Sequence, residues 1–187
     1  MHPTQFQYVR AALLDQIAGH DMHTTLILVT GLSGSGKTTW CARLAEEATA
    51  RGLRVAGLLC PAVFTAEGKA AIDVVDLITG ERRRLADLRG VETHLPTVGE
   101  WQFYPEVIAW ANHALRDLPN PDLLIIDELG PLEFKHHDGF LTALSLLDAR
   151  HHRAACVVVR HSLLSQARAR WPWHGSVIDL TPDAKQA

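Results

Sequence analysis

The sequence predicts an α/β fold, with a mainly parallel β-sheet flanked by helices. Short, continuous apolar runs of strand length alternate with longer segments whose apolar residues recur at helical spacing. A glycine-rich stretch joins the first apolar run to the helical segment that follows it. This alternation is typical of parallel strands buried on both faces, because each crossover lays a helix over the sheet.

The first part of the chain contains an extra helix and the first strand, loop and helix. Apolar residues at helical spacing predict an amphipathic helix over about 5–17, which either covers an edge of the core or contacts a partner. Residues 25–30 are apolar and β-branched and predict a strand, whereas 37–51 have helical composition that ends near Gly52. We therefore divide the chain into an N-terminal helical extension, 1–24, and one domain, 25–187.

The next elements are a second strand and a β-hairpin. Residues 54–59 predict a buried strand, which stops before Pro61 because proline cannot donate to a sheet. The runs 72–78 and 82–85 flank Thr79-Gly80-Glu81, a sequence typical of a hairpin turn. We expect this hairpin to be an insertion in the fold.

The remaining elements continue the alternation. Helices are predicted over 103–118, which the Pro119-Asn120-Pro121 stretch ends, and over 140–149. Apolar runs predict strands over 123–126, 154–159 and 177–180.

Length and composition indicate one globular domain. The 187 residues are enough for one large core, and 47% apolar with 21% charged residues is ordinary globular usage. The formal net charge of -3 lacks the basic excess of nucleic-acid-binding domains, so we expect no nucleic-acid partner.

The cysteines and the apolar runs bear on the location of the protein. Cys41, Cys60 and Cys156 are odd in number and widely separated, which favours reduced core thiols. The N-terminal stretch lacks the apolar region of a signal peptide, and the longest apolar runs are far below the roughly 20 residues needed to span a bilayer. We expect a cytoplasmic protein without a membrane partner.

Residues Gly31-Leu32-Ser33-Gly34-Ser35-Gly36-Lys37-Thr38 match the Walker A pattern, G-x-x-x-x-G-K-[ST], between a predicted strand and helix. Glycines allow the tight turn that points backbone N–H groups at phosphate oxygens, and the helix N-terminus adds its positive dipole end. Lys37 is predicted to neutralise the outer phosphates and Thr38 to bind Mg²⁺. Thr39 either reaches the inner phosphate or only begins the helix.

Residues 123–128, Leu-Leu-Ile-Ile-Asp-Glu, have the Walker B form of an apolar strand that ends in a carboxylate. We expect Asp127 to hold Mg²⁺ directly or through water. Glu128 follows at once, so its side chain leaves in another direction and is predicted to orient or deprotonate a water beside the outermost phosphate. Gly130 and Pro131 turn the chain immediately afterwards.

Several other polar and aromatic residues are weaker candidates. Glu133 is interpreted as a solvated surface residue. Arg160 and His161 end a strand at the expected phosphate edge, where they either neutralise phosphate charge or simply face water. The arginines at 82–84, 168 and 170 are assigned to solvated faces, the histidine pairs lack the spacing of a zinc site, and the tryptophans at 101, 110, 171 and 173 are assigned to the core.

The heptad Asp127-Glu128-Leu129-Gly130-Pro131-Leu132-Glu133 resembles the D-E-[IL]-G-P-[ML]-E signature of the small THEP-type nucleoside triphosphatases. The resemblance runs from about residue 26 to 180 and implies a RecA-like P-loop core and slow hydrolysis of several nucleoside triphosphates. The implied nucleotide-binding residues are Gly31, Leu32, Ser33, Gly34, Ser35, Gly36, Lys37, Thr38, Leu123, Leu124, Ile125, Ile126, Asp127, Glu128, Leu129 and Gly130. The family usually carries an acidic residue and an arginine where this chain has residues 61–65, Pro-Ala-Val-Phe-Thr.

The predicted activity is Mg²⁺-dependent hydrolysis of ATP, GTP or another nucleoside triphosphate, with Glu128 and Lys37 as the catalytic residues. Two alternatives remain. A small-molecule or nucleotide kinase would use the same P-loop with an acceptor pocket and a lid, for which only residues 82–89 are candidates. A nucleotide-dependent adaptor would signal to a protein partner through the hairpin or the N-terminal helix.

Overall fold

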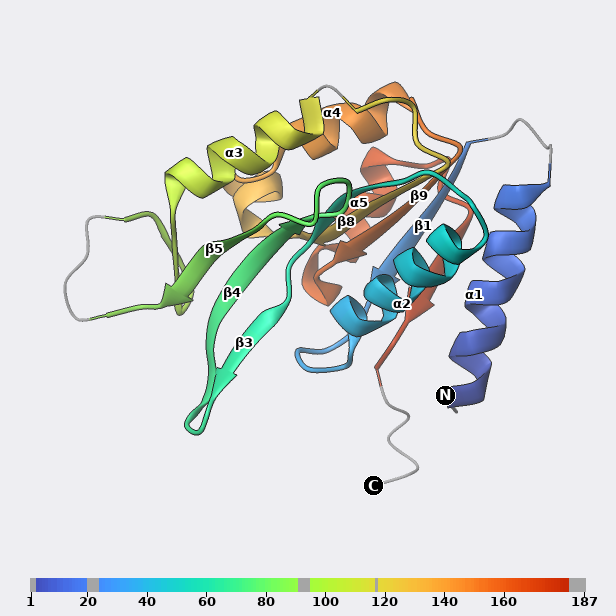
Figure 1. Cartoon of the computed structure of the whole chain (residues 1–187). Helices are drawn as coiled ribbons and strands as arrows, with labels where there is room; N and C mark the ends of the chain where they lie inside the picture. Colours follow the sequence, from blue (N-terminus) through green and yellow to red (C-terminus); the bar gives the residue numbers. More distant parts are fainter. Residues whose placement is uncertain (1–2, 20–23, 91–94, 117, 182–187) are drawn as a thin grey trace.

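A computed structural model describes residues 3–19, 24–90, 95–116 and 118–181 (Figure 1). The strands within these ranges form one sheet in the order β10-β1-β9-β8-β2-β4-β5-β7-β6, and β3 pairs with β4. The strands are β1 Thr25–Thr30, β2 Val55–Leu59, β3 Ala62–Thr65, β4 Gly68–Asp76, β5 Arg82–Leu88, β6 Thr97–Val98, β7 Trp101–Phe103, β8 Leu123–Leu129, β9 Ala154–Val159 and β10 Ser176–Asp179. The helices are α1 Pro3–Ala18, α2 Lys37–Ala50, α3 Pro105–Arg116, α4 Leu141–Ala149 and α5 Leu164–Arg170, with a π-helical turn at Leu132–His136 and a 3₁₀ turn at His161–Leu163.

One half of the sheet is parallel and consists of β10, β1, β9, β8 and β2. All five strands were expected, and the α/β fold class is confirmed. Close packing in this half requires glycine at Gly57, where φ is +121° and a Cβ would collide with the Ile125 backbone of β8. Because the strands are parallel, their carboxyl ends meet at one edge, where ligands bind in such folds.

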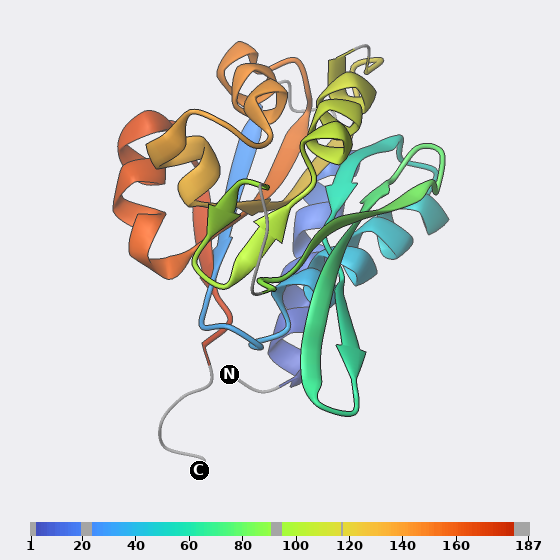
Figure 2. The same cartoon turned by 90° about the vertical axis from the view of Figure 1, so that its left-hand side faces the viewer.

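Helices cover both faces of the sheet, so the molecule has three layers (Figures 1 and 2). The apolar residues of α3, α4 and α5 pack on one face, and those of α1 and α2 pack on the other. The side chains of β1 alternate between the layers: Leu26 and Leu28 join the first cluster, whereas Ile27 and Val29 join the second. This double burial explains why these strands are continuous apolar runs.

The other half of the sheet is antiparallel. The expected hairpin is present as β4 and β5, and it extends the main sheet because β4 pairs with β2 through Leu58–Asp76 and Leu59–Val75. Strands β3, β6 and β7 were not expected. They are two to four residues long, and β3 is only half-buried or exposed, so none of them produces an apolar run.

Helix α1 packs against the face that carries α2. Leu13, Leu14 and Ile17 are buried in the same cluster as the apolar side of α2. Arg10 is also buried, and its Nη2 lies 2.8 Å from Oε1 of Glu47 on α2. Of the two roles expected for this helix, the structure shows the packing role. None of the described helices is long and apolar enough to cross a membrane.

Candidate active site

The loop between β1 and α2 has the conformation that the Walker A pattern predicts. Gly31, Gly34 and Gly36 have φ angles of 143°, 77° and 86°, which side chains rarely tolerate. At Gly31 an added Cβ would lie 2.7 Å from the Ser35 Oγ and 3.2 Å from the Leu180 carbonyl carbon, so the loop itself excludes a side chain. The loop leads into the 14-residue α2, whose N-terminus carries the positive end of the helix dipole.

The half-buried Lys37 side chain folds back over this loop. Its Nζ donates hydrogen bonds to the carbonyl oxygens of Gly31 at 2.9 Å and Leu32 at 2.8 Å. Neutral carbonyls do not cancel the charge, so the ammonium group remains available to an anion held by the loop amides. Thr39 is exposed at the start of α2, which fits a helix-start role.

Asp127 lies at the carboxyl end of β8 and is 1% exposed. Its Oδ2 accepts a hydrogen bond from the Cys60 backbone N–H at 3.1 Å. Burial raises the pKa of Asp127 to about 7, although the hydrogen bonds from Cys60 and the Thr38 hydroxyl and the charge of Lys37 lower it in part. The fold therefore brings together Thr38 and Asp127, the two residues predicted to hold a metal.

These two side chains fit Mg²⁺. The ion prefers hard oxygen donors and is usually held by one or two carboxylates together with substrate phosphates. A buried carboxylate next to a hydroxyl supplies such oxygens, and a cation would offset the cost of ionising Asp127 away from water.

Glu128 occupies an irregular position in β8. The register with β9 passes from Asp127–Val158 directly to Leu129–Val159, so Glu128 is the extra residue of a β-bulge. Asp127 and Leu129 are buried, whereas the Glu128 side chain is 36% exposed. Bulges redirect side chains next to active sites, and here Glu128 is accessible beside the buried Asp127.

Arg160, at the end of β9, holds the Glu128 carboxylate. Its Nε donates to Oε1 of Glu128 at 2.7 Å. The interpretation of Arg160 as a charge that only faces water is therefore wrong. His161 is more exposed than Arg160. Its ion-pair partner is Asp179, with 3.9 Å between Nδ1 and Oδ2, and not Asp127 or Glu128.

The interpretation of Glu133 as a solvated residue is also wrong, because it is 4% exposed. Its Oε2 accepts from the Gly130 N–H and its Oε1 from the Phe140 N–H, each at 2.8 Å. Burial raises its pKa to about 7, although hydrogen bonds from the Phe140 and Gly130 backbones lower it in part. Glu133 thus fixes the turn after β8, a role that its fixed spacing from Asp127 and Gly130 in the heptad would have suggested.

The other arginines and the tryptophans have their own partners. Arg84 pairs with Asp73 and Asp87, and Arg170 pairs with Asp148. Trp171 is fully buried, as predicted. The core assignment is incomplete for the rest, because Trp101, Trp110 and Trp173 are partly buried and each lies against a cationic side chain.

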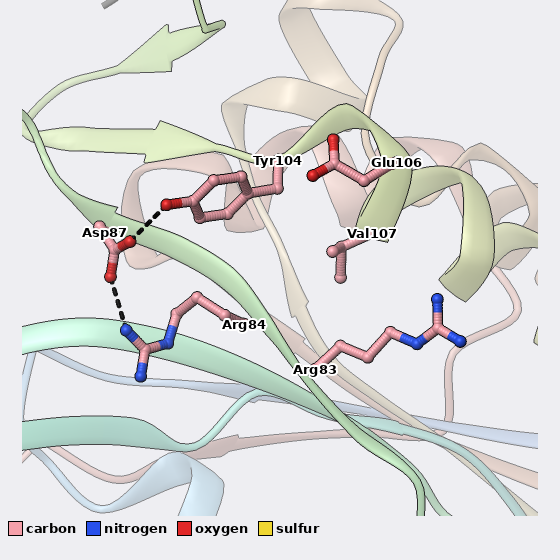
Figure 3. A pocket seen from close by; sticks show the side chains of 6 residues that line it. All are labelled: Arg83, Arg84, Asp87, Tyr104, Glu106 and Val107. Atoms are coloured by element: carbon pink, nitrogen blue, oxygen red, sulfur yellow. Dashed lines mark hydrogen bonds and ion pairs between the residues drawn. The ribbon is translucent and has the colours of Figure 1, made fainter.

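A separate cavity of about 540 Å³ lies between β5 and the start of α3 (Figure 3). In it, Asp87 accepts hydrogen bonds from the Tyr104 hydroxyl at 2.6 Å and Arg84 Nη1 at 2.7 Å. Partial burial raises the pKa of Asp87, but the hydrogen bonds from Tyr104 and Arg84 outweigh it and leave that pKa below its ordinary value. None of the lining residues belongs to the Walker motifs, so this cavity is distinct from the predicted nucleotide site.

Comparison with known proteins gives consistent matches. A family model described as NTPase matches residues 26–186. Nucleoside-triphosphatase THEP1 of Pyrococcus abyssi (strain GE5 / Orsay) is 34% identical over 162 residues, which cover 83% of each chain. Nucleoside-triphosphatase THEP1 of Methanothermobacter thermautotrophicus is 36% identical over 135 residues, which cover 68% of this chain and 76% of the relative.

Two solved structures share the fold. The crystal structure of THEP1 from the hyperthermophile Aquifex aeolicus aligns with a TM-score of 0.62 and 18% identity, over 84% of this chain and 91% of that one. The solution structure of a human cancer-related nucleoside triphosphatase aligns with a TM-score of 0.60 and 20% identity, over 86% and 90% of the two chains.

Proposed function

This chain belongs to the NTPase family, and we propose from that premise that it hydrolyses nucleoside triphosphates to the diphosphate and phosphate. The observation that carries the proposal is the arrangement of Glu128. It lies at a β-bulge beside the buried Asp127, is held by Arg160, and is at the same sheet edge as the P-loop. The relatives are named as triphosphatases, which favours hydrolysis over the kinase and adaptor alternatives.

The nucleotide binds with its phosphates in the loop from Gly31 to Thr38. The loop N–H groups and the N-terminus of α2 bind phosphate oxygens, and Lys37 neutralises the outer phosphates. Residues 123–130 form the second wall of this site. The proposed catalytic domain is 25–187, and 1–24 is an extension whose helix α1 packs on α2. Residues 1–2, 20–23, 91–94, 117 and 182–187 lie outside the described residues.

Thr38 and Asp127 would hold Mg²⁺. The ion would supply positive charge that stabilises the negative charge developing on the phosphates. The chain's own contribution is to present a hydroxyl and a carboxylate at one point of the sheet edge, with the Cys60 N–H fixing the orientation of the carboxylate.

Glu128 positions the water that attacks the outermost phosphate. The water oxygen forms a bond to the terminal phosphorus, and the bond from that phosphorus to the bridging oxygen breaks, with its electron pair leaving on the diphosphate. Glu128 accepts a hydrogen bond from the water and takes up its proton. Arg160 keeps the Glu128 carboxylate at the sheet edge through the 2.7 Å contact. Cys41 and Cys156 are free, with their sulfurs 3.9 Å apart, and we propose a cytoplasmic location because thiols stay reduced there.

The test is phosphate release from ATP, GTP, CTP and UTP, each measured with and without Mg²⁺. Glu128→Gln keeps the shape of the side chain but removes the carboxylate, so turnover should fall about 10²- to 10⁴-fold while nucleotide affinity changes little. Lys37→Ala is the control for contaminating activity. Release at the parental rate by Glu128→Gln, with none from Lys37→Ala, would remove Glu128 from the reaction.

A further inference from the structure

The hairpin of β3 and β4 extends past the edge of the sheet that carries the P-loop. Only Asp76 and Val75 of β4 pair with β2, opposite Leu58 and Leu59. Strand β2 ends at Leu59, so the rest of β4 lies beyond its carboxyl end, paired instead with β3 and β5. Figures 1 and 2 show the hairpin projecting from the sheet on the side of the loop that precedes α2. The hairpin is therefore placed to contact what the loop binds.

Lys69 on this hairpin is a half-buried cation whose partner is an aromatic ring. Its Nζ lies 4.5 Å from the centroid of the Trp101 ring on β7. Within the described ranges, no carboxylate forms an ion pair with it. A ring face offsets only part of the cost of removing an ammonium group from water. An anionic ligand would offset more of that cost.

The charges that act on Lys69 are those of the candidate active site. Loss of solvent lowers the pKa of Lys69, the carboxylates of Glu128 and Asp127 raise it, and the cations Arg160 and Lys37 lower it further. Glu128 and Asp127 belong to β8, Arg160 directly follows β9, and Lys37 is part of the P-loop motif. Lys69 thus adds a third positive side chain, carried by a different segment, to a site that already holds Lys37 and Arg160.

We propose that Lys69 binds the outermost phosphate of the bound nucleoside triphosphate, opposite the P-loop. The proposal rests on the proposed function and adds a phosphate-binding residue to it. In phosphoryl transfer, negative charge is spread over the oxygens of the transferred group, and a cation from outside the P-loop stabilises it. Lys69 forms no covalent bond; it donates hydrogen bonds to a phosphate oxygen, while Trp101 supports the side chain from the other side.

This role predicts discrimination between triphosphate and diphosphate. A lysine that contacts only the outermost phosphate contributes to the affinity for a triphosphate and not to that for a diphosphate. A lysine that only stabilises the hairpin through Trp101 would change both affinities alike. The ratio of the two affinities separates these roles, and its measurement requires no turnover.

The experiment measures the dissociation constants of adenosine 5′-(β,γ-imido)triphosphate and ADP, both with Mg²⁺, by calorimetry. Lys69→Met keeps the length of the side chain and its contact with Trp101 but removes the charge. It should weaken triphosphate binding about 10- to 100-fold, the usual effect of a hydrogen bond to a charged group, and leave ADP binding unchanged. It should also lower kcat about 10²- to 10³-fold.

Two further variants sharpen the result. Lys69→Arg keeps the charge and should restore most of the triphosphate preference. Lys135→Met removes an exposed lysine of the turn after β8 and should leave both affinities at the parental values. If Lys69→Met is unstable, Lys69→Gln replaces it in the same comparison.

An unchanged ratio of the two affinities in Lys69→Met, or an equal change in Lys135→Met, would overturn the assignment of Lys69. Failure of the parent protein to release phosphate from any triphosphate would instead overturn the hydrolase proposal. In that case the affinity ratio still decides whether Lys69 contacts the outermost phosphate.

Discussion

At the scale of single residues, the site depends on ion pairs between charged side chains. Arg160 and Glu128 form one such pair, with 2.7 Å between Nε and Oε1. The fold fixes the backbone positions of the two residues, and the ion pair fixes the position of the Glu128 carboxylate. Since a small displacement of a reacting group costs as much as 10²-fold in rate, the pair should matter more for turnover than for binding.

We therefore expect Arg160→Met to lower kcat about 10²-fold while the affinity for a diphosphate changes little. The matched control is Arg170→Met, which removes an arginine paired with Asp148 at the surface. Steady-state kinetics and calorimetry on the two variants give the comparison. Equal kcat values in the two variants would mean that Arg160 does not position Glu128.

Glu133 is a second residue whose importance is structural. Both of its carboxylate oxygens accept backbone N–H groups, from Gly130 and Phe140. Glu133→Gln replaces one acceptor by an NH₂ group that faces a backbone donor. The free energy of unfolding should fall by about 1–3 kcal/mol, the cost of leaving a buried polar group unsatisfied. Glu67→Gln, at an exposed position in the β3–β4 turn, should have no measurable effect on stability.

The same pair of variants tests the pH dependence. Burial raises the pKa of Glu133 from 4.5 to about 7, so the folded state binds this proton more tightly than the unfolded state. The contribution of Glu133 to stability is then complete below pH about 4.5 and is lost as the pH rises to about 7. The gap in unfolding free energy between the parent and Glu133→Gln should shrink over that range in urea titrations. A gap that widens with pH would contradict the raised pKa.

At the scale of elements, α1 behaves as part of the core. Leu14 is completely buried in the cluster that it shares with α2, whereas Tyr8 on the same helix is 72% exposed. Leu14→Ala should lower the unfolding free energy by about 2–5 kcal/mol. Tyr8→Ala should change it by about 0.5 kcal/mol or less. Equal effects in denaturant titrations would show that α1 does not pack stably on the domain.

At the scale of the whole molecule, ligand binding and folding are linked. The proposed nucleotide site draws on the loop between β1 and α2 and on the ends of β8 and β9, so a bound nucleotide would stabilise only the folded chain. At about 100 times its dissociation constant, an Mg²⁺-nucleotide should add roughly 2.7 kcal/mol, which is a rise of about 5–10 °C in melting temperature. Lys37→Ala should abolish most of that rise in a thermal scan. An unchanged rise would exclude Lys37 from the site.

The sequence by itself determined the parallel core and the two Walker segments. Strands buried on both faces must be continuously apolar, and a loop with positive φ angles requires glycine at fixed positions, so both leave local patterns. Runs 25–30 and 154–159 are strands with the expected bounds, and Gly31, Gly34 and Gly36 occupy the turns. Short strands such as β3 and β6 bury too little apolar surface to leave such a pattern.

Only the tertiary structure decided which charged residues meet. The contact between Arg160 and Glu128 joins residues 32 positions apart, and the place of Lys69 depends on a hairpin pairing with β2. The β-bulge at Glu128 and the burial of Glu133 likewise follow from packing between elements. Contacts between side chains on different segments are not encoded by a local spacing in the sequence, whereas the hydrogen bond between Glu133 and Gly130 spans three positions and is the local exception.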